Sequence, residues 1–329
     1  MKERILHTNA TILSGSRHPE FAASVAAHLD APLGEIKLTR FANSEIKVEV
    51  PAVRDNYVFV IQSHGAPVDE ALMEQAAIIN AAQRASARDI TAVVPYRGYG
   101  RADKPDNQHE SYMGPLTMRI LESAGANRMI EVDPHAGQSA GFFEKPSTEY
   151  TPIPSYPAII RYLEPIMNEP GSDVVIVSPD SGRAKLNRHY AEHFDRLRAI
   201  VDKMRTGTNH VEVMDIIGKV AGTHCVMIDD MIDTAGTIIE GATALRKLGA
   251  ETITIVATHG IFSEPAVERL WRARESQIID KVAVTDTLAL PSDMPEDLVD
   301  IISVAPLVGD AIHDIYHGKS VSSRYSQLA

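Results

Sequence analysis

Short apolar runs alternate with longer amphipathic runs along nearly the whole chain, and this alternation limits the folds open to it. Val174–Ser178 is followed by Ala184–Phe194, and Cys225–Ile228 is followed by Thr237–Leu248. Such short apolar runs are typical of strands buried on both faces, and the amphipathic runs are long enough for helices. Because repeated strand–helix–strand units build parallel sheets, we expect an α/β fold with mainly parallel sheets flanked by helices.

The length of 329 residues fits two related domains, and an apolar fraction of 44% is enough to bury two cores. The strand–helix pattern restarts near the proline-rich stretch Pro152–Pro157. We therefore expect domains at residues 1–152 and 153–329. The amphipathic helix expected over Leu307–His317 could pack back on the first domain or on a partner subunit.

The formal net charge of −12 argues against a nucleic-acid partner, since phosphate backbones bind basic surfaces. Small phosphates are not excluded, because local cations, backbone N–H groups and a divalent cation such as Mg²⁺ can hold them. The one cysteine, Cys225, is expected to be a small buried residue. We find no run long enough for a membrane span and no signal-like N-terminus, so we expect no membrane partner and a cytoplasmic location.

The most specific motif runs from His224 to Ile238. Two adjacent carboxylates, Asp229 and Asp230, follow its apolar strand, where they could accept hydrogen bonds from vicinal sugar hydroxyls. A small-residue turn then enters a helix, whose first N–H groups and partial positive charge suit a phosphate. The turn consists of Asp233, Thr234, Ala235, Gly236 and Thr237. The simpler alternative is a capped helix start beside a solvated turn.

Polar residues also follow other expected strands, and ligands of open parallel sheets bind at the carboxyl ends of strands. Asp180 is a candidate cation or hydroxyl ligand, and His135 follows another strand. The basic and aromatic stretch Tyr96–Lys104 suits a polyphosphate. The structural alternatives are a capped helix start for Asp180, a structural role for His135 and a solvated loop for Tyr96–Lys104.

The polar segment Asp202–His210 is expected to be a mobile loop. Its cations Lys203 and Arg205 could close over a triphosphate and neutralise the charge that develops during transfer. An exposed loop with incidental cations is the alternative.

Together these segments resemble the ribose-phosphate pyrophosphokinase family, also called phosphoribosyl-pyrophosphate synthetase, over essentially the whole chain. The resemblance is carried by Leu13–Ser16, Arg40–Ile46, Val60–Ser63, Arg84–Tyr96, Val132–Gln138, Val177–Asp180, Asp202–Arg205, Asp229–Thr237 and Lys319–Ser322. It implies two phosphoribosyltransferase-like domains and an enzyme that transfers the diphosphoryl group of ATP to the 1-hydroxyl of ribose 5-phosphate. The implied products are 5-phospho-α-D-ribose 1-diphosphate and AMP, for nucleotide biosynthesis. The implied cofactor is Mg²⁺ and the implied assembly is a homo-oligomer, commonly a hexamer.

The resemblance also implies roles for individual residues. The ATP-side positions are Phe41, Asn43, Ser44, Glu45, Arg101, Ala102, Asp103 and His135. The magnesium-associated pair is His135 and Asp180, and the catalytic cations are Lys203 and Arg205. The ribose-5-phosphate positions are Asp229, Asp230, Asp233, Thr234, Ala235, Gly236 and Thr237.

Some positions depart from the family pattern. Arg183 stands where the pattern has glycine, Met204 replaces the middle cation of a run of three, and Ala102 replaces a glutamine. Two alternatives are a phosphoribosyltransferase, which consumes the same sugar diphosphate, and a non-catalytic relative that binds synthetase subunits. The ATP-type segments of the first half argue against the former, and Lys203 with Arg205 against the latter.

Overall fold

Contacts between residues divide the chain into two units, each with its own sheet. The computed structural model describes residues 6, 9–105, 107–171, 173–206 and 211–325, and of 203–206 and 211–214 it describes the backbone. Unit 1 comprises Met1–Ser155, Asp286–Ala289 and Ser303–Leu328, and unit 2 comprises Tyr156–Thr285 and Leu290–Ile302. Each unit therefore joins segments that are distant in the sequence.

Unit 1 is built on a parallel sheet. Its strands are β1 (Ala10–Ser14), β2 (Leu33–Gly34), β5 (Tyr57–Ile61), β6 (Asp89–Val94), β7 (Arg128–Val132) and β8 (Glu149–Ile153). Its helices are α1 (Pro19–His28), α2 (Val68–Arg84), α3 (Met113–Ala124), α8 (Ala305–Tyr316), α9 (Val321–Tyr325) and the 3₁₀ turn η1 (Gly137–Gly141). The strand order is β2-β1-β5-β6-β7-β8, and β3 (Lys37–Arg40) with β4 (Ile46–Glu49) forms a separate antiparallel hairpin.

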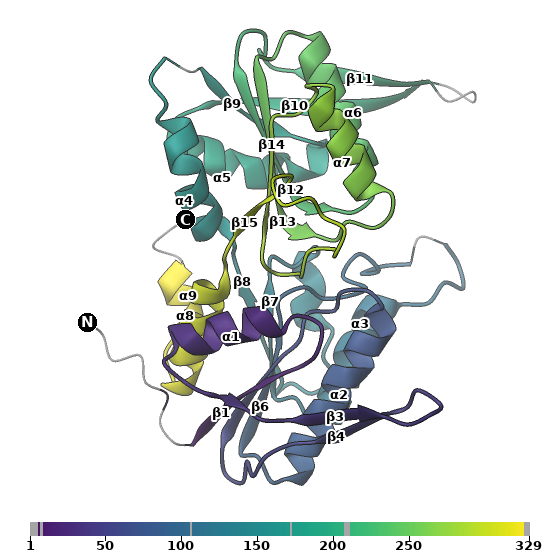
Figure 1. The fold of residues 1–329 in the computed structure, drawn as a ribbon, viewed down its shortest axis with the longest axis vertical. Coiled ribbons are helices and arrows are strands. Elements are labelled where there is room, and N and C mark those ends of the chain that lie inside the picture. Colours follow the sequence, from purple (N-terminus) through teal and green to yellow (C-terminus); the bar gives the residue numbers. More distant parts are fainter. Residues whose placement is uncertain (1–5, 7–8, 106, 172, 207–210, 326–329) are drawn as a thin grey trace. The chain divides into compact units, whose positions relative to one another are not determined.

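Helices cover both faces of this sheet, with α1 and α8 on one side and α2 and α3 on the other (Figure 1). Val58 and Val60 of β5 share a core with Leu72 of α2 and Met118 of α3. The side chains of neighbouring strand residues point to opposite faces, so Phe59, which is also buried, faces the other layer. The central strands β5 and β6 are mainly apolar, as expected for strands with both faces covered.

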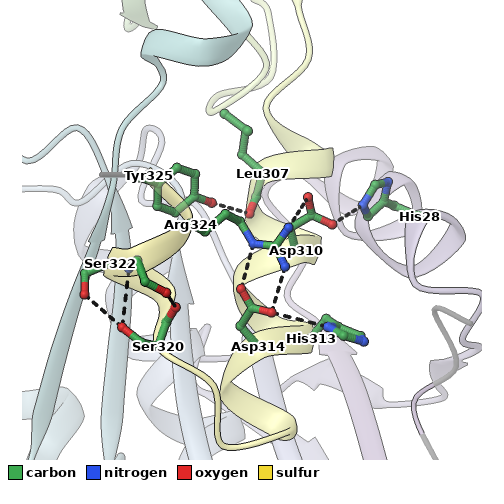
Figure 2. A network of polar contacts seen from close by, with 10 residues as sticks. His28, Leu307, Asp310, His313, Asp314, Ser320, Ser322, Arg324 and Tyr325 are labelled. Carbon is green, nitrogen blue, oxygen red and sulfur yellow. Dashed lines mark hydrogen bonds and ion pairs between the residues drawn. The ribbon is translucent and has the colours of Figure 1, made fainter. Parts of the chain in front are cut away.

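A polar network connects the C-terminal helices α8 and α9 with each other and with the rest of unit 1, as Figure 2 shows. Arg324 of α9 donates two hydrogen bonds to Asp314 of α8, from Nε to Oδ2 at 2.6 Å and from Nη2 to Oδ1 at 2.7 Å. Its Nη1 lies 3.3 Å from Asp310 Oδ2, and the other oxygen of Asp310 lies 2.9 Å from His28 Nε2 of α1. The network therefore links α9 to α8 and α8 to α1.

Unit 2 contains a larger sheet with one antiparallel pair. Its strands are β9 (Val174–Ser178), β10 (Leu197–Thr206), β11 (Val211–Ile217), β12 (His224–Ile232), β13 (Thr252–Gly260), β14 (Lys281–Thr285) and β15 (Asp300–Ile302). Its helices are α4 (Tyr156–Met167), α5 (Ala184–Phe194), α6 (Gly236–Lys247), α7 (Ala266–Glu275) and the 3₁₀ turn η2 (Ser181–Arg183). The order is β11-β10-β9-β12-β13-β14-β15, and β10 and β11 are antiparallel.

Helices also cover both faces of this second sheet, with α4 and α5 on one side and α6 and α7 on the other (Figure 1). Val177 of β9 and Met227 of β12 share a core with Ile238 of α6 and Leu270 of α7. Cys225 is fully buried in the same core, as predicted. The predicted α/β fold is thus confirmed, with mainly parallel sheets flanked by helices.

Two predicted elements have different bounds in the structure. Strand β10 continues to Thr206 and pairs with β11, so residues 202–206 form a strand where a loop was expected. Residues 207–210 of that expected loop lie outside the described residues. Strand β12 continues to Ile232, so Asp229 and Asp230 lie within it rather than after it. Every helix among the described residues is too short or too polar to cross a bilayer.

Candidate functional site

The sheet of unit 2 changes direction of winding between β9 and β12. From β9 the chain adds β10 and β11 on one side, and it then returns to place β12 on the other side of β9. The loops that leave two such neighbouring strands diverge to opposite faces and leave a crevice at the carboxyl ends of the strands. Asp180 follows β9, and Asp229 and Asp230 lie near the end of β12, so three of the predicted residues meet at this point.

Asp229 and Asp230 extend past the end of β9. Strand β12 pairs with β9 only as far as Met227, whereas its pairing with β13 continues through Asp229, opposite Ala257. The Asp230 N–H donates to Asp229 Oδ1 at 2.8 Å, and Asp230 is only 6% exposed. Pairing with β13 alone therefore holds the two carboxylates side by side at the crevice.

Burial raises the pKa of the Asp229 carboxyl. A side-chain hydrogen bond with Asp230 and the negative charge of Asp230 raise this pKa further, whereas the main-chain N–H of Asp230 and the nearby Arg183 guanidinium lower it. Adjacent carboxylates cannot both ionise freely in a partly dry site. The pair is thus suited to share a proton, a cation or hydroxyl donors.

Arg183 supplies the cation that this pair contacts in the structure. Its Nη2 forms an ion pair with Asp230, and its Nε lies 3.6 Å from Asp229 Oδ1. Its main-chain N–H donates to Asp180 Oδ1 at 2.9 Å, so Asp180 caps the 3₁₀ turn η2. The predicted Asp180 and the predicted acidic pair are thus joined through Arg183, which the sequence singled out only as an unusual bulky residue.

Asn187 is a residue of this site that sequence reasoning missed. It lies on α5, is fully buried, and its Nδ2 is 2.9 Å from Ile228 O, 3.1 Å from Ser178 Oγ and 3.3 Å from Val177 O. One amide thus bonds to the ends of both strands that form the crevice. The available signal was an asparagine in a helix interior, where that residue is disfavoured unless its side chain has a specific partner.

The turn between β12 and α6 has the geometry of an anion-binding loop. Ala235 adopts a left-handed conformation, with φ of 60°, directly before α6 begins. The Ile239 N–H bonds to Ala235 O at 3.2 Å, so the N–H groups of Gly236 and Thr237 precede the helical hydrogen-bond ladder. Such N–H groups at a helix start attract a phosphate.

Arg269 of α7 holds this turn and was also missed from the sequence. Its Nη1 donates to the main-chain carbonyl of Thr234 at 2.9 Å. A Cβ at position 236 would lie 3.3 Å from the same nitrogen, so Gly236 leaves room for the arginine.

Lys203 and Arg205 lie on β10, opposite Met214 and Glu212 of β11. Their side chains lie outside the described part of the chain.

In unit 1, the predicted positions from Phe41 to Glu45 form the tip of the β3–β4 hairpin. The Phe41 N–H donates to Glu45 O and the Ser44 N–H donates to Phe41 O, both at 2.9 Å. Asn43 accepts from the Glu45 N–H at 3.2 Å, which closes the turn. The Phe41 side chain is 56% exposed at this tip.

The predicted segments around Arg101 and His135 are brought together within unit 1. Gln138 donates a hydrogen bond to Asp103, and a Cβ at Gly100 would lie 4.0 Å from the His135 Cβ. Ala102 accepts a hydrogen bond from the Gly114 N–H at 2.8 Å, which fixes the other end of the loop.

Buried Arg97 anchors the loop that carries Arg101. Its Nε lies 2.9 Å from Glu131 Oε2, and its Nη2 lies 3.0 Å from Ser139 Oγ. A fully buried arginine is stable only with such partners. The loop and the segment after β7 therefore share one rigid anchor.

The acidic and imidazole side chains are the groups of this site that could bind a metal ion. Among the described residues, no group of three or more His, Cys, Asp or Glu side chains could hold an ion by itself. Asp180 presents an exposed carboxylate. Mg²⁺ usually binds one or two carboxylates and completes its shell with waters and substrate phosphates. The residues therefore fit a magnesium ion that arrives with a polyphosphate.

Two family models match the chain. One is described as the N-terminal domain of ribose phosphate pyrophosphokinase and matches residues 10–125. The other is described as a phosphoribosyl synthetase-associated domain and matches residues 202–326.

Full-length relatives show the same similarity. The ribose-phosphate pyrophosphokinase of Caldanaerobacter subterraneus subsp. tengcongensis is 40% identical over 97% of this chain and 99% of its own. Ribose-phosphate pyrophosphokinase 1 of Spinacia oleracea is 41% identical over 96% of this chain and 92% of its own. The crystal structure of phosphoribosylpyrophosphate synthetase from Mycobacterium smegmatis matches with a TM-score of 0.86 at 35% identity, over 94% of this chain and 100% of its own.

Proposed function

The chain belongs to the ribose-phosphate pyrophosphokinase family, and from this premise we propose which residues carry out its reaction. The enzyme transfers the diphosphoryl group of ATP to the 1-hydroxyl of ribose 5-phosphate. The products are 5-phospho-α-D-ribose 1-diphosphate and AMP, and the sugar diphosphate serves nucleotide biosynthesis.

We assign the acceptor site to unit 2. The observation that carries this assignment is the acidic pair Asp229 and Asp230 beside the anion-binding turn Asp233–Thr237, at the crevice between β9 and β12. The turn and the start of α6 bind the 5-phosphate through main-chain N–H groups. The carboxylates accept hydrogen bonds from the vicinal ribose hydroxyls, which leaves the 1-hydroxyl free to react.

We assign ATP binding to the predicted residues of unit 1. Arg101 and Asp103 contact the nucleotide and its phosphates, and His135 lies beside their loop. The hairpin tip Phe41–Glu45 holds the adenine of the ATP that is bound to a neighbouring subunit. Its exposed phenylalanine supports this role, because an exposed aromatic ring can stack on a base. The assignment requires a homo-oligomer, which we propose to be a hexamer.

The reaction depends on position and charge. The 1-hydroxyl attacks the β-phosphorus in line with the departing AMP, and little covalent chemistry is required of the protein. Lys203 and Arg205 neutralise the charge that develops on the transferring group. Asp180 and His135 are the residues that would hold a magnesium ion, which would supply positive charge that lowers the repulsion between phosphate oxygens. A cytoplasmic location stays a prediction.

An assay of AMP formation tests this function. Purified protein is mixed with Mg²⁺, ATP and ribose 5-phosphate, and then with GTP or CTP in place of ATP. We expect AMP only when the sugar phosphate is present, and no product after chelation of the metal. Absence of turnover, together with binding to an active synthetase, would instead indicate the regulatory alternative.

A further inference from the structure

Arg183 lies against the two carboxylates that we assign to the ribose hydroxyls. The guanidinium contacts Asp230 directly and lies 3.6 Å from Asp229. The side chains of Arg183, Asp229 and Asp230 are 21%, 17% and 8% exposed. Because little water surrounds them, their attraction is weakly screened.

A guanidinium and a pair of vicinal hydroxyls cannot both occupy these oxygens with good geometry. Both are hydrogen-bond donors, and the arginine donates from a planar fork that matches carboxylates closely. We infer that Arg183 is an intramolecular competitor of the acceptor sugar, which must displace the guanidinium from the acidic pair before it binds. The inference rests on the assignment of this pair to the ribose hydroxyls.

The backbone around Arg183 is fixed, so the displacement needs only its side chain. The Arg183 N–H is held by Asp180 Oδ1 at 2.9 Å, at the start of α5. One helical turn later, Asn187 anchors the same helix to Ile228 O at 2.9 Å. A long side chain can therefore change rotamer while α5 stays in place.

The competition has a specific consequence for binding. When a binding site is open for only a fraction of the time, the apparent dissociation constant equals the intrinsic constant divided by that fraction, and is therefore larger. Arg183 should therefore weaken binding of ribose 5-phosphate and leave ATP binding unchanged. In the unliganded protein the same contact offsets the repulsion between the two carboxylates.

The test compares wild type with Arg183→Ala and Arg183→Gln, both of which keep the main-chain bond to Asp180. Arg188→Ala is the matched control, because Arg188 lies on the same helix and pairs with exposed Glu192 at 2.6 Å. Binding of ribose 5-phosphate to the full-length protein is measured by calorimetry with Mg²⁺ and a non-hydrolysable ATP analogue. We expect both Arg183 variants to bind the sugar phosphate about tenfold more tightly, and the control to match wild type.

Weaker binding in both Arg183 variants would show that this arginine is a ligand of the sugar, and equal binding would show that it does not compete. Either result overturns the inference. Melting temperature and ATP-analogue affinity report whether a variant is folded, and the glutamine variant keeps more of the side chain if the alanine variant is unstable. If wild type and variants all fail to bind ribose 5-phosphate or to form AMP, the proposed function itself is wrong, and the inference falls with it.

Discussion

The side-chain amide of Asn187 donates a hydrogen bond to the main-chain carbonyl of Ile228, 2.9 Å away, directly before Asp229. The same amide nitrogen is shared with Ser178 at the end of β9. One buried residue of α5 therefore holds together the two strand ends that carry Asp180 and the acidic pair. The geometry of the crevice depends on this amide.

Asn187→Asp should reduce kcat at least tenfold and destabilise the protein by roughly 1–3 kcal/mol. The new carboxylate has the same shape, but it has no N–H to donate to the carbonyl oxygens of Val177 and Ile228. Asn80→Asp, at an exposed position of α2, is the control. Kinetics well below the melting temperature separate the two effects, and a variant with lower stability but normal kcat and KM would limit Asn187 to a structural role.

Lys203→Ala should lower turnover by about two orders of magnitude or more, with little change in stability. The residue lies opposite Met214 of β11, beyond the part of β10 that pairs with β9. Lys247→Ala, at the exposed C-terminal end of α6, is the matched control. Initial rates of AMP formation and urea unfolding give the two quantities, and near-normal turnover would contradict the catalytic role.

His64 should make unit 1 less stable at acid pH. Burial lowers the pKa of this histidine to about 4, and the nearby Arg97 charge lowers it as well. Its Nε2 lies 2.8 Å from Gln75 Oε1, and because the Gln75 amide donates elsewhere, this histidine nitrogen is the donor.

The unfolded chain takes up a proton near the ordinary histidine pKa of 6.5, whereas the folded chain does not. The contribution of neutral His64 to the free energy of unfolding is therefore complete above about pH 6.5. It is lost as the pH falls toward 4, by about 3 kcal/mol in total. His64→Gln should reduce the difference in unfolding free energy between pH 7.5 and pH 4.5. An identical pH dependence in both proteins would show that His64 is protonated when folded.

Arg324→Ala should loosen α9 from α8 and cost about 1–2 kcal/mol of local stability. Burial raises the pKa of Asp314, but the hydrogen bonds and charges of Arg324 and His313 together lower it by more. The stability that ionised Asp314 contributes is therefore present above the ordinary carboxyl pKa, and it is lost as the pH falls through the lowered pKa of Asp314. Hydrogen exchange of Val321–Tyr325 checks this, with Arg272→Ala, paired to exposed Glu268, as control. Equal exchange in wild type and variant at neutral pH would contradict it.

Much of the fold could be predicted because the central elements carry a clear period. The structure gives α3, α4, α5 and β9 the bounds that the apolar pattern indicated. Strand β8 was missed because Pro152 argues against a strand, and the structure places it at the edge of the sheet, where proline is tolerated.

The chemistry of the candidate site was predictable only in part. Position after a strand indicated Asp180, whereas the acidic pair, which was expected to follow its strand, lies within β12. The ion pairs of Arg183 depend on how tightly the turn after β9 brings α5 back over β12, and sequence spacing does not report that path. The strand at 202–206 was likewise missed, because its polar residues are ordered through pairing with β11.

The most direct measurement is ³¹P NMR of the complete reaction with ATP, Mg²⁺ and ribose 5-phosphate. The account predicts AMP and 5-phospho-α-D-ribose 1-diphosphate in equal amounts from wild type, and a loss of both when Asp229 and Asp230 are changed to asparagine. ADP together with ribose 1,5-bisphosphate would contradict diphosphoryl transfer. Full turnover by the double variant would contradict the acceptor site.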